Sequence, residues 1–191
     1  EGVIFSSNTA KQEDATKVAY GGAIENTNKA KIYISTDSAN TKTTEFIYNQ
    51  ADRGGAVNNY NNAEIQIGKN ANFSSNTAEI AGAAIFNETN STITIGDNVN
   101  FNSNVATGNK SGNYTYGGGA IWNNDKSTVN IGSNVVFSSN SALGNGFGGA
   151  IYNLNNSTIN ITGSNIQFTS NNANKNGGAI YNKGAFINLG K

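Results

Sequence analysis

Six copies of one two-part pattern run through the chain and constrain its architecture more than any other feature. The first part reads Gly-Gly-Ala-Ile-x-Asn, as in residues 148–153, and the second part reads Phe-x-x-Asn-x-Ala, as in residues 137–142. The Phe of the second part recurs every 27 to 41 residues. Repeats of this length with short apolar runs are typical of solenoids, in which each repeat forms one coil and buries its apolar face against its neighbours.

Three short apolar segments recur in each repeat and predict three strands per coil. One begins at the Ile or Val of the first part, one contains an alternating pair such as Ile93 and Ile95, and one contains the Phe of the second part. Alternation of apolar and polar residues is typical of strands. Because parallel crossovers are nearly always right-handed, we predict an all-β, right-handed parallel β-helix. It would have about six coils with three short strands each and form a single domain over residues 1–191, cut from a longer array.

The spacing of the repeats varies mostly at one corner of the predicted coil. The gap between the Phe and the next Ile or Val anchor ranges from 11 to 20 residues. The longest excursions there are Lys11 to Tyr20 and Thr107 to Gly117, and a separate insertion lies around Thr36 to Thr43. Insertions at one corner would project from one edge of the solenoid, which is a frequent location for binding.

The Phe and Asn of the second part are predicted to be structural. Stacked Phe rings would fill the interior of the coil, and stacked Asn side chains would hydrogen-bond along its axis. A second Asn, two residues after each anchor, is expected to form a similar ladder at Asn26, Asn59, Asn87, Asn123, Asn153 and Asn182. The structural motif residues are Phe5, Asn8, Phe46, Asn49, Phe73, Asn76, Phe101, Asn104, Phe137, Asn140, Phe168 and Asn171.

The residue after each anchor offers the best binding candidates, because it points away from the interior if the anchor points inward. This position is aromatic in four successive repeats, at Phe86, Trp122, Tyr152 and Tyr181. An exposed ladder of rings would suit a sugar or a partner protein. The alternative is that the rings stack across strands or are covered by a flanking segment. Tyr114, Tyr116 and Phe147, near the variable corner, would extend the surface.

Composition argues against several other functions. The formal net charge is zero and only 13% of residues are charged, so a basic face for nucleic acid or an anionic membrane surface is not indicated. The chain contains no Cys and no His, which removes the commonest metal ligands and general base. We therefore expect no metal, no cofactor, no catalysis and no direct membrane insertion. The acidic residues are scattered in sequence, including Asp37, but carboxylates could still meet across coils.

The paired motifs resemble the repeats of the polymorphic outer membrane proteins of chlamydiae. All six Phe-x-x-Asn copies are intact, whereas the third copy of the first part departs from the pattern as Gly82-Ala83-Ala84-Ile85. The resemblance implies the β-helical passenger of an autotransporter, anchored in the outer membrane through a separate C-terminal region. It also implies an adhesin and surface antigen, located at the bacterial cell surface or secreted.

From the residues and the resemblance together, we expect a passenger fragment of a bacterial surface adhesin. It would bind a host-cell surface receptor, either protein or glycan, through a rigid face and its corner loops. Two alternatives remain open. One is a structural stalk that associates end to end through unpaired strand edges. The other is a polysaccharide-binding or polysaccharide-degrading β-helix, which would require carboxylates from adjacent coils to meet in a cleft.

Overall fold

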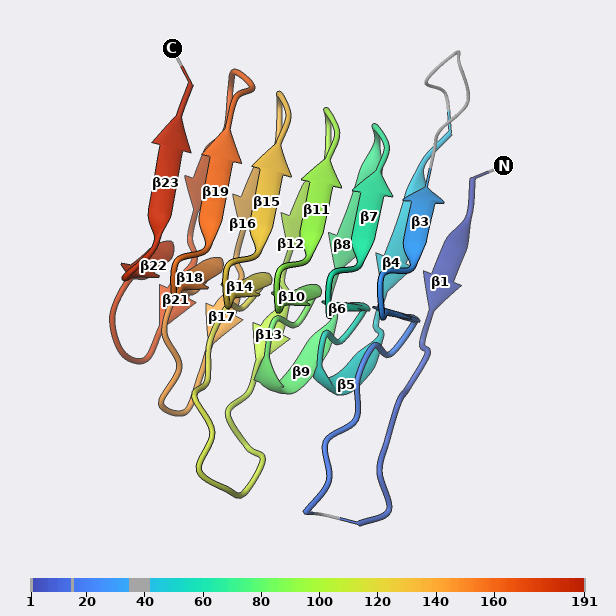
Figure 1. The fold of residues 1–191 in the computed structure, drawn as a ribbon, viewed down its shortest axis with the longest axis vertical. Coiled ribbons are helices and arrows are strands. Elements are labelled where there is room, and N and C mark those ends of the chain that lie inside the picture. The colour runs from blue at the N-terminus through green and yellow to red at the C-terminus, as the bar shows by residue number, and fades with distance from the viewer. Residues whose placement is uncertain (1, 15, 35–41, 191) are drawn as a thin grey trace.

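The computed structural model describes residues 2–14, 16–34 and 42–190, and within them every regular element is a strand. The strands stack side by side into an elongated coil that carries the chain from its N-terminal to its C-terminal end (Figure 1). They form four parallel sheets, three with six strands and one with five. Since the described residues form no helix, they include none that could cross a membrane.

Two of the sheets are built from the second part of the repeat. In the Phe sheet, the strands are β1 (Ile4–Ser6), β4 (Thr44–Ile47), β8 (Ala71–Ser74), β12 (Asn100–Asn102), β16 (Val136–Ser138) and β20 (Gln167–Thr169). The Ala sheet follows it in each coil and contains β5 (Gln50–Arg53), β9 (Thr77–Ala81), β13 (Val105–Ala106), β17 (Ser141–Ala142) and β21 (Asn172–Ala173).

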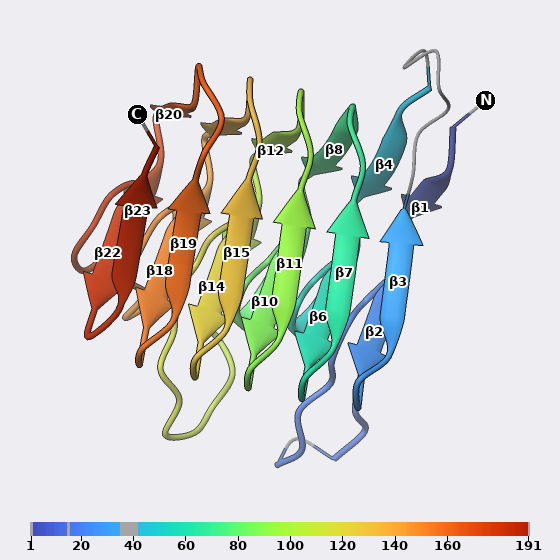
Figure 2. The same cartoon turned by 45° about the horizontal axis from the view of Figure 1, so that its top comes forward.

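The other two sheets come from the first part of the repeat and the alternating pair. The anchor sheet contains β2 (Ile24–Thr27), β6 (Val57–Tyr60), β10 (Ile85–Glu88), β14 (Ile121–Asn124), β18 (Ile151–Leu154) and β22 (Ile180–Lys183). The Ile sheet contains β3 (Lys31–Ile34), β7 (Glu64–Ile67), β11 (Thr92–Ile95), β15 (Thr128–Ile131), β19 (Thr158–Ile161) and β23 (Phe186–Leu189), which are adjacent in Figure 2.

The register of the sheets confirms the predicted parallel β-helix. Equivalent motif residues pair from coil to coil, so that Phe101 lies between Phe73 and Phe137. The three predicted strands per coil are present, and the five-stranded Ala sheet adds a fourth to most coils. Its strands begin directly after the motif Asn and place an Ala inward, as at Ala78 and Ala142, which are fully buried. The right-handed sense of the coil stays a prediction from the crossover rule.

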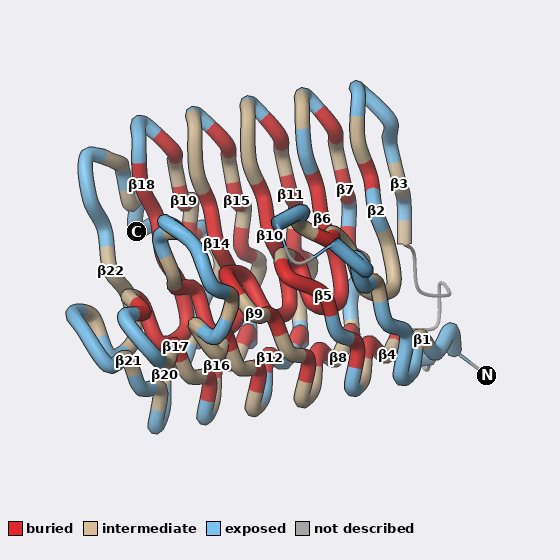
Figure 3. Tube along the Cα trace, turned by 90° about the horizontal axis from the view of Figure 1, so that it is seen from below, coloured by how far each residue is buried: buried red, intermediate tan, exposed pale blue. Residues whose placement is uncertain are grey.

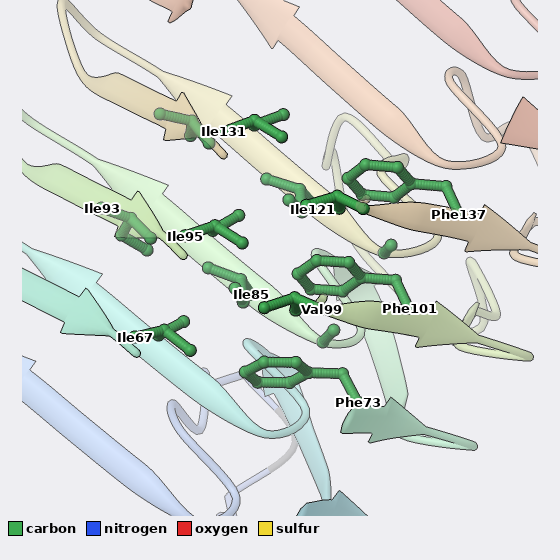
Figure 4. Close-up of a cluster of buried hydrophobic side chains, with 14 of the residues drawn as sticks. Ile67, Phe73, Ile85, Ile93, Ile95, Val99, Phe101, Ile121, Ile131 and Phe137 are labelled. Carbon is green, nitrogen blue, oxygen red and sulfur yellow. The ribbon is translucent and has the colours of Figure 1, made fainter. Parts of the chain in front are cut away.

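The interior is a narrow stack of identical apolar layers. Six Phe rings lie face to face along the axis, with neighbouring centroids 4.5 to 4.9 Å apart and planes within 10° of parallel. Figure 4 shows Phe73, Phe101 and Phe137 lying beside the anchors Ile85 and Ile121. Burying each such side chain stabilises the fold by about 1.5–3 kcal/mol. Figure 3 shows buried segments running from coil to coil through the centre of the rod.

Both predicted Asn ladders are present and mostly buried. In the motif ladder, the backbone N–H and the side-chain Nδ2 of Asn76 both donate to Oδ1 of Asn104, at 3.0 and 2.9 Å. Asn76 Nδ2 also donates back to the carbonyl oxygen of Phe46, at 2.9 Å. In the second ladder, Asn87 Nδ2 donates to Oδ1 of Asn123 at 2.8 Å. Because buried amides are costly without partners, these bonds link the coils at two corners.

The corners of each coil are tight turns that use left-handed backbone conformations. The residue before each motif Asn has a φ of 54° to 57°, for example 56° at Ser139. In the glycine pair, Gly148 has a φ of 64°, which glycine adopts without a steric penalty. A Cβ on the following Gly149 would overlap the carbonyl oxygen of Gly178 in the next coil. The pair therefore serves both the turn and the close packing of successive coils.

The variable segments project from the corner between the Ala and anchor sheets. The excursions within residues 11–20, of which residue 15 lies outside the described residues, and 107–117 extend from the same side of the rod, toward the bottom of Figure 1. This arrangement confirms the predicted edge for insertions. The insertion around Thr36 to Thr43 lies between the Ile and Phe sheets, and its residues 36–41, Asp37 among them, lie outside the described residues.

Replacing Phe101 with Ala should lower the free energy of unfolding by about 3–5 kcal/mol, because it removes a fully buried ring from the middle of the stack and leaves a cavity. Urea denaturation followed by circular dichroism would measure the loss. Phe186→Ala is the matched control, since Phe186 is 58% exposed, and it should change stability by no more than about 0.5 kcal/mol. Equal losses in the two variants would contradict the stacked core.

Candidate functional site

The predicted aromatic column lies on the outer side of the anchor sheet, in register from coil to coil. Phe86 pairs with Trp122, Trp122 with Tyr152, and Tyr152 with Tyr181. The expected exposure of this column is wrong. Phe86 is 1% exposed, Trp122 is 5% exposed and Tyr152 is 3% exposed, while Tyr181 is half-buried. The residues point away from the coil interior but into a second apolar cluster, so the alternative of a covering segment is the one observed.

The second cluster is made by chain that returns over the anchor sheet. Ile80 and Ala81 from β9 are buried in it, and the excursion 107–117 places Tyr114 and Tyr116 against it. Phe147 packs on the rings of Tyr152 and Tyr181, with centroids 5.6 and 4.8 Å away. The candidates Tyr114 and Tyr116 are thus partly buried parts of the cover, each with some ring surface accessible.

Ring contacts within the cluster differ from those of the Phe stack. Phe86 and Trp122 are stacked at 5.8 Å, whereas Trp122 and Tyr152 meet edge to face at 4.7 Å. Burial raises the pKa of Tyr152 above its usual value, with a smaller contribution from Tyr181. Trp122 Nε1 is buried and has no acceptor among the described residues. The cluster is therefore apolar enough to hold these rings as a packed layer.

Asp52 connects the two long excursions to the rod. Its Oδ2 accepts a hydrogen bond of 2.7 Å from the backbone N–H of Ala19, at the end of the first excursion. The same oxygen lies 3.1 Å from Nζ of Lys110, in the excursion two coils further along. The side chains of Lys110 and Asp52 are 11% and 9% exposed. Two loops far apart in sequence are therefore fastened to one buried carboxylate.

The electrostatics of this contact favour the charged pair. The hydrogen bond to Asp52 raises the pKa of Lys110 above its usual 10.5, although desolvation acts in the opposite direction. A raised lysine pKa contributes stability that is fully present below pH 10.5 and is lost as the pH rises through the folded-state pKa. The tether of the second excursion is consequently intact throughout the neutral and mildly alkaline range.

Arg53, the only arginine in the chain, lies between the rod and both excursions. Its guanidinium carbon is 5.2 Å from the ring centroid of Phe86 and 6.0 Å from those of Tyr20 and Tyr114. Its NH1 is 4.0 Å from Oε2 of Glu88 in the next coil. A cation among three rings is favourable when it is partly desolvated, so Arg53 holds the edge of the aromatic cluster together.

A pocket of about 330 Å³ opens beside Arg53, where the aromatic column ends. It is lined by Tyr20, Glu25, Thr27, Asn28, Arg53, Asn58, Tyr60 and Glu88. Glu25 and Asn58 occupy, in the first two coils, the position that is aromatic in the later four. The repeat pattern gave no signal for this pocket, because the pocket forms where the aromatic residues of the column are absent.

A smaller pocket of about 230 Å³ lies at the same corner and is lined by Thr9, Ala10, Lys11, Gln50, Ala51, Asp52 and Glu79. It brings carboxylates from two adjacent coils, Asp52 and Glu79, to one cavity. This meets the condition that the sequence analysis set for the polysaccharide-degrading alternative. Asp52 is already engaged with Lys110 and the backbone of Ala19, which is typical of a structural carboxylate.

Three exposed tyrosines were not predicted from the sequence. Tyr33 and Tyr48 are 61% and 64% exposed on other sides of the rod, and Tyr60 is 39% exposed at the rim of the 330 Å³ pocket. None of them belongs to a repeating aromatic position, so the motif gave no signal for them. The Phe and Asn motif residues, in contrast, lie in the interior and its corners, where they serve the fold.

These observations define a parallel β-helix with one edge covered by tethered loops. Residues 134–154 and 165–183 match the family model of the Chlamydia polymorphic membrane protein repeat. The matched segments contain β16–β18 and β20–β22, so the resemblance of the repeats is confirmed in the last two coils. Comparisons with curated proteins and with solved structures find no match. A β-helix made of such repeats fits the passenger of a surface protein.

Replacing Lys110 with Ala should loosen the second excursion and uncover the aromatic cluster. Trp122 is the only tryptophan, so its fluorescence reports on this cover directly. We expect stronger acrylamide quenching and a red-shifted emission in Lys110→Ala, with the far-ultraviolet circular dichroism unchanged. Lys69→Ala is the control, because it removes an ion pair with Asp97, of 3.2 Å, that lies outside the cluster. Unchanged quenching in Lys110→Ala would contradict the role of the tether.

Proposed function

We propose that the chain is part of the passenger of a bacterial surface adhesin and binds a host-cell surface receptor without catalysis. In this proposal it is held at the cell surface through an outer-membrane-anchored parent protein, or is released from it. The repeat match in residues 134–154 and 165–183 supports the assignment to a surface protein passenger.

The observation that supports a binding role is that both excursions are held in place at one edge of the rod. A long insertion that is left free costs a solenoid little stability. Both excursions here are instead fastened to Asp52 and packed on an aromatic layer. The second excursion is further ordered by a hydrogen bond of 2.6 Å from the Tyr116 hydroxyl to the carbonyl oxygen of Lys110. A preorganised loop loses less conformational freedom on binding, which favours recognition of a partner.

The contact surface in this proposal is the outer side of the excursions and not the aromatic column. Ser111, Asn113 and Thr115 are exposed next to the partly buried Tyr114 and Tyr116. A receptor would meet this polar strip together with the accessible parts of the two rings. The combination of partly exposed tyrosines and small polar residues is common at recognition surfaces.

Labelled, folded chain should bind epithelial cells saturably, and the triple variant Ser111→Glu, Asn113→Glu, Thr115→Glu should lose most of that binding. Three negative charges at exposed positions alter the surface without disturbing the buried rings. The matched control places the same charges on the Phe sheet face, at the exposed Asn100, Asn102 and Gln167. Flow cytometry with dye-labelled protein would measure both variants against the parent chain.

Equal binding by the loop variant and its control would move the contact surface away from the excursions. No binding by the folded parent chain would contradict the adhesin proposal itself and favour a stalk. Circular dichroism and Trp122 fluorescence of each variant confirm that the fold and the covered cluster are retained in the comparison.

A self-associating stalk is the second candidate function. Among the described residues, the terminal strands of the Phe, anchor and Ile sheets pair with another strand on one side only, and apolar side chains are exposed there. Ile4 is 63% exposed at one end of the rod, and Leu189 is 73% exposed at the other. Unpaired strand edges with apolar residues favour edge-to-edge pairing. A molar mass that rises with concentration in light scattering would favour the stalk, and a constant monomer mass would oppose it.

The polysaccharide-degrading alternative receives less support. The carboxylates that meet at the 230 Å³ pocket include Asp52, which two contacts already occupy. A general acid or base must be free to exchange a proton with a substrate, and an anion held by an ammonium group and an N–H is poorly suited to that task. We therefore keep binding without chemistry as the proposed function.

A further inference from the structure

The pocket beside Arg53 is a consequence of how the outward column changes along the rod. The outward position after the anchor is aromatic in coils three to six, beginning with Phe86. The same position holds Asn58 in coil two and Glu25 in coil one. Strands β2, β6 and β10, which hold these three positions, are adjacent in Figure 2. Smaller polar side chains leave the space that rings fill elsewhere, and the hollow of about 330 Å³ results. This size is at the lower end of the range for small-ligand sites.

Two buried polar atoms at this pocket have no hydrogen-bond partner among the described residues. They are Oδ1 of Asn58 and Nε of Arg53. Asn58 is 1% exposed, so bulk solvent scarcely reaches it, but its side chain lines the pocket. Buried polar groups in folded proteins nearly always have a partner, and an exception needs an explanation. One of the two atoms accepts hydrogen bonds and the other donates.

A hydroxyl group is the simplest partner that satisfies both atoms, since one oxygen donates a proton and also accepts one. An ammonium group can donate but not accept, and a carboxylate or phosphate can accept but not donate. The unpaired atoms therefore favour a ligand that carries hydroxyl groups.

The charges at the pocket, together with its unpaired donor, favour a neutral ligand. Glu25 and Glu88 contribute two negative charges and Arg53 one positive charge, so the lining opposes an anion. The two carboxylates would attract a free amine, but an ammonium group cannot accept the hydrogen bond that Nε of Arg53 offers. The ring of Tyr60, 39% exposed at the rim, offers an apolar face for the C–H side of a sugar.

We propose that this pocket binds one neutral sugar unit of a glycan, with a hydroxyl group bridging Asn58 and Arg53 and the ring face resting on Tyr60. The proposal deepens the adhesin function, on which it rests for its biological setting, by naming the receptor class. It adds a second contact, beside the first excursion, which contributes Tyr20, to the polar strip of the second excursion.

Saturation-transfer difference NMR on the full chain with methyl glycosides tests the proposal. The probes are the methyl glycosides of galactose, glucose and N-acetylglucosamine, with glucuronic acid and glucosamine as charged counterparts. At least one neutral glycoside should bind saturably with a dissociation constant on the order of millimolar, and the charged sugars should bind more weakly. Asn58→Leu and Tyr60→Ala should each weaken that binding by about tenfold or more.

Tyr33→Ala is the matched control, because Tyr33 is an exposed tyrosine of the Ile sheet outside the pocket, and its affinity should equal that of the parent chain. Asn58→Leu also removes a buried unpaired acceptor, so its thermal stability should not fall, which separates lost binding from lost folding. If none of the neutral glycosides binds saturably, the proposal is overturned. Binding that survives both pocket substitutions would overturn it as well.

The two proposals fail separately. Cell binding by a chain that binds no glycoside leaves the adhesin proposal standing and removes the sugar pocket. Glycoside binding that requires Asn58 and Tyr60, in a chain that does not bind cells, keeps the pocket and removes the host-cell receptor.

Discussion

The fold depends on a buried chain of amide hydrogen bonds that joins every coil to the next. At the motif Asn, two donors of one coil converge on a single side-chain oxygen of the following coil, as from Asn104 to Asn140 at 3.1 and 2.9 Å. A shift of the register by one residue would bury several amide groups without partners, each at a cost of about 1–3 kcal/mol. The Asn corner therefore fixes the register, and the Phe stack, with its spacing of 4.5 to 4.9 Å, can form only in that register.

A rigid frame of this kind decides where variation can occur. The corners with Asn ladders keep nearly constant spacing, while the corner between the Ala and anchor sheets accepts the excursions 11–20 and 107–117. There the two excursions meet Asp52, cover the rings of the anchor sheet and leave an open pocket where the rings stop. The recognition surfaces that we propose lie on this one edge, because the residues on the other sides of the rod maintain the repeating structure.

The structural features that repeat along the chain could be predicted from the sequence, and those that occur once could not. The three strands, the Phe stack and both Asn ladders follow from positions that recur in all six copies. The Ala strand was missed because it is as short as two residues, as in β13, and reads as the tail of the motif. The exposure of Trp122 was mispredicted because alternation along a strand tells which side of the sheet a residue faces, but not what covers that side. The pair of Asp52 and Lys110 involves unique residues 58 positions apart, and no local pattern connects them.

The amide ladders also give the rod a direction. Because the backbone N–H of each motif Asn from Asn8 to Asn140 donates to the same oxygen as its side-chain nitrogen, the orientation of these amides is fixed. In every link between two motif Asn residues, the amide oxygen of the C-terminal coil is the acceptor. One end of the stack is thus chemically different from the other, as in a polar filament. Contacts that continue the ladder along the axis must join unlike ends. Such head-to-tail contacts are heterologous and do not close on themselves, so axial growth would be open-ended and would not stop at a symmetric dimer.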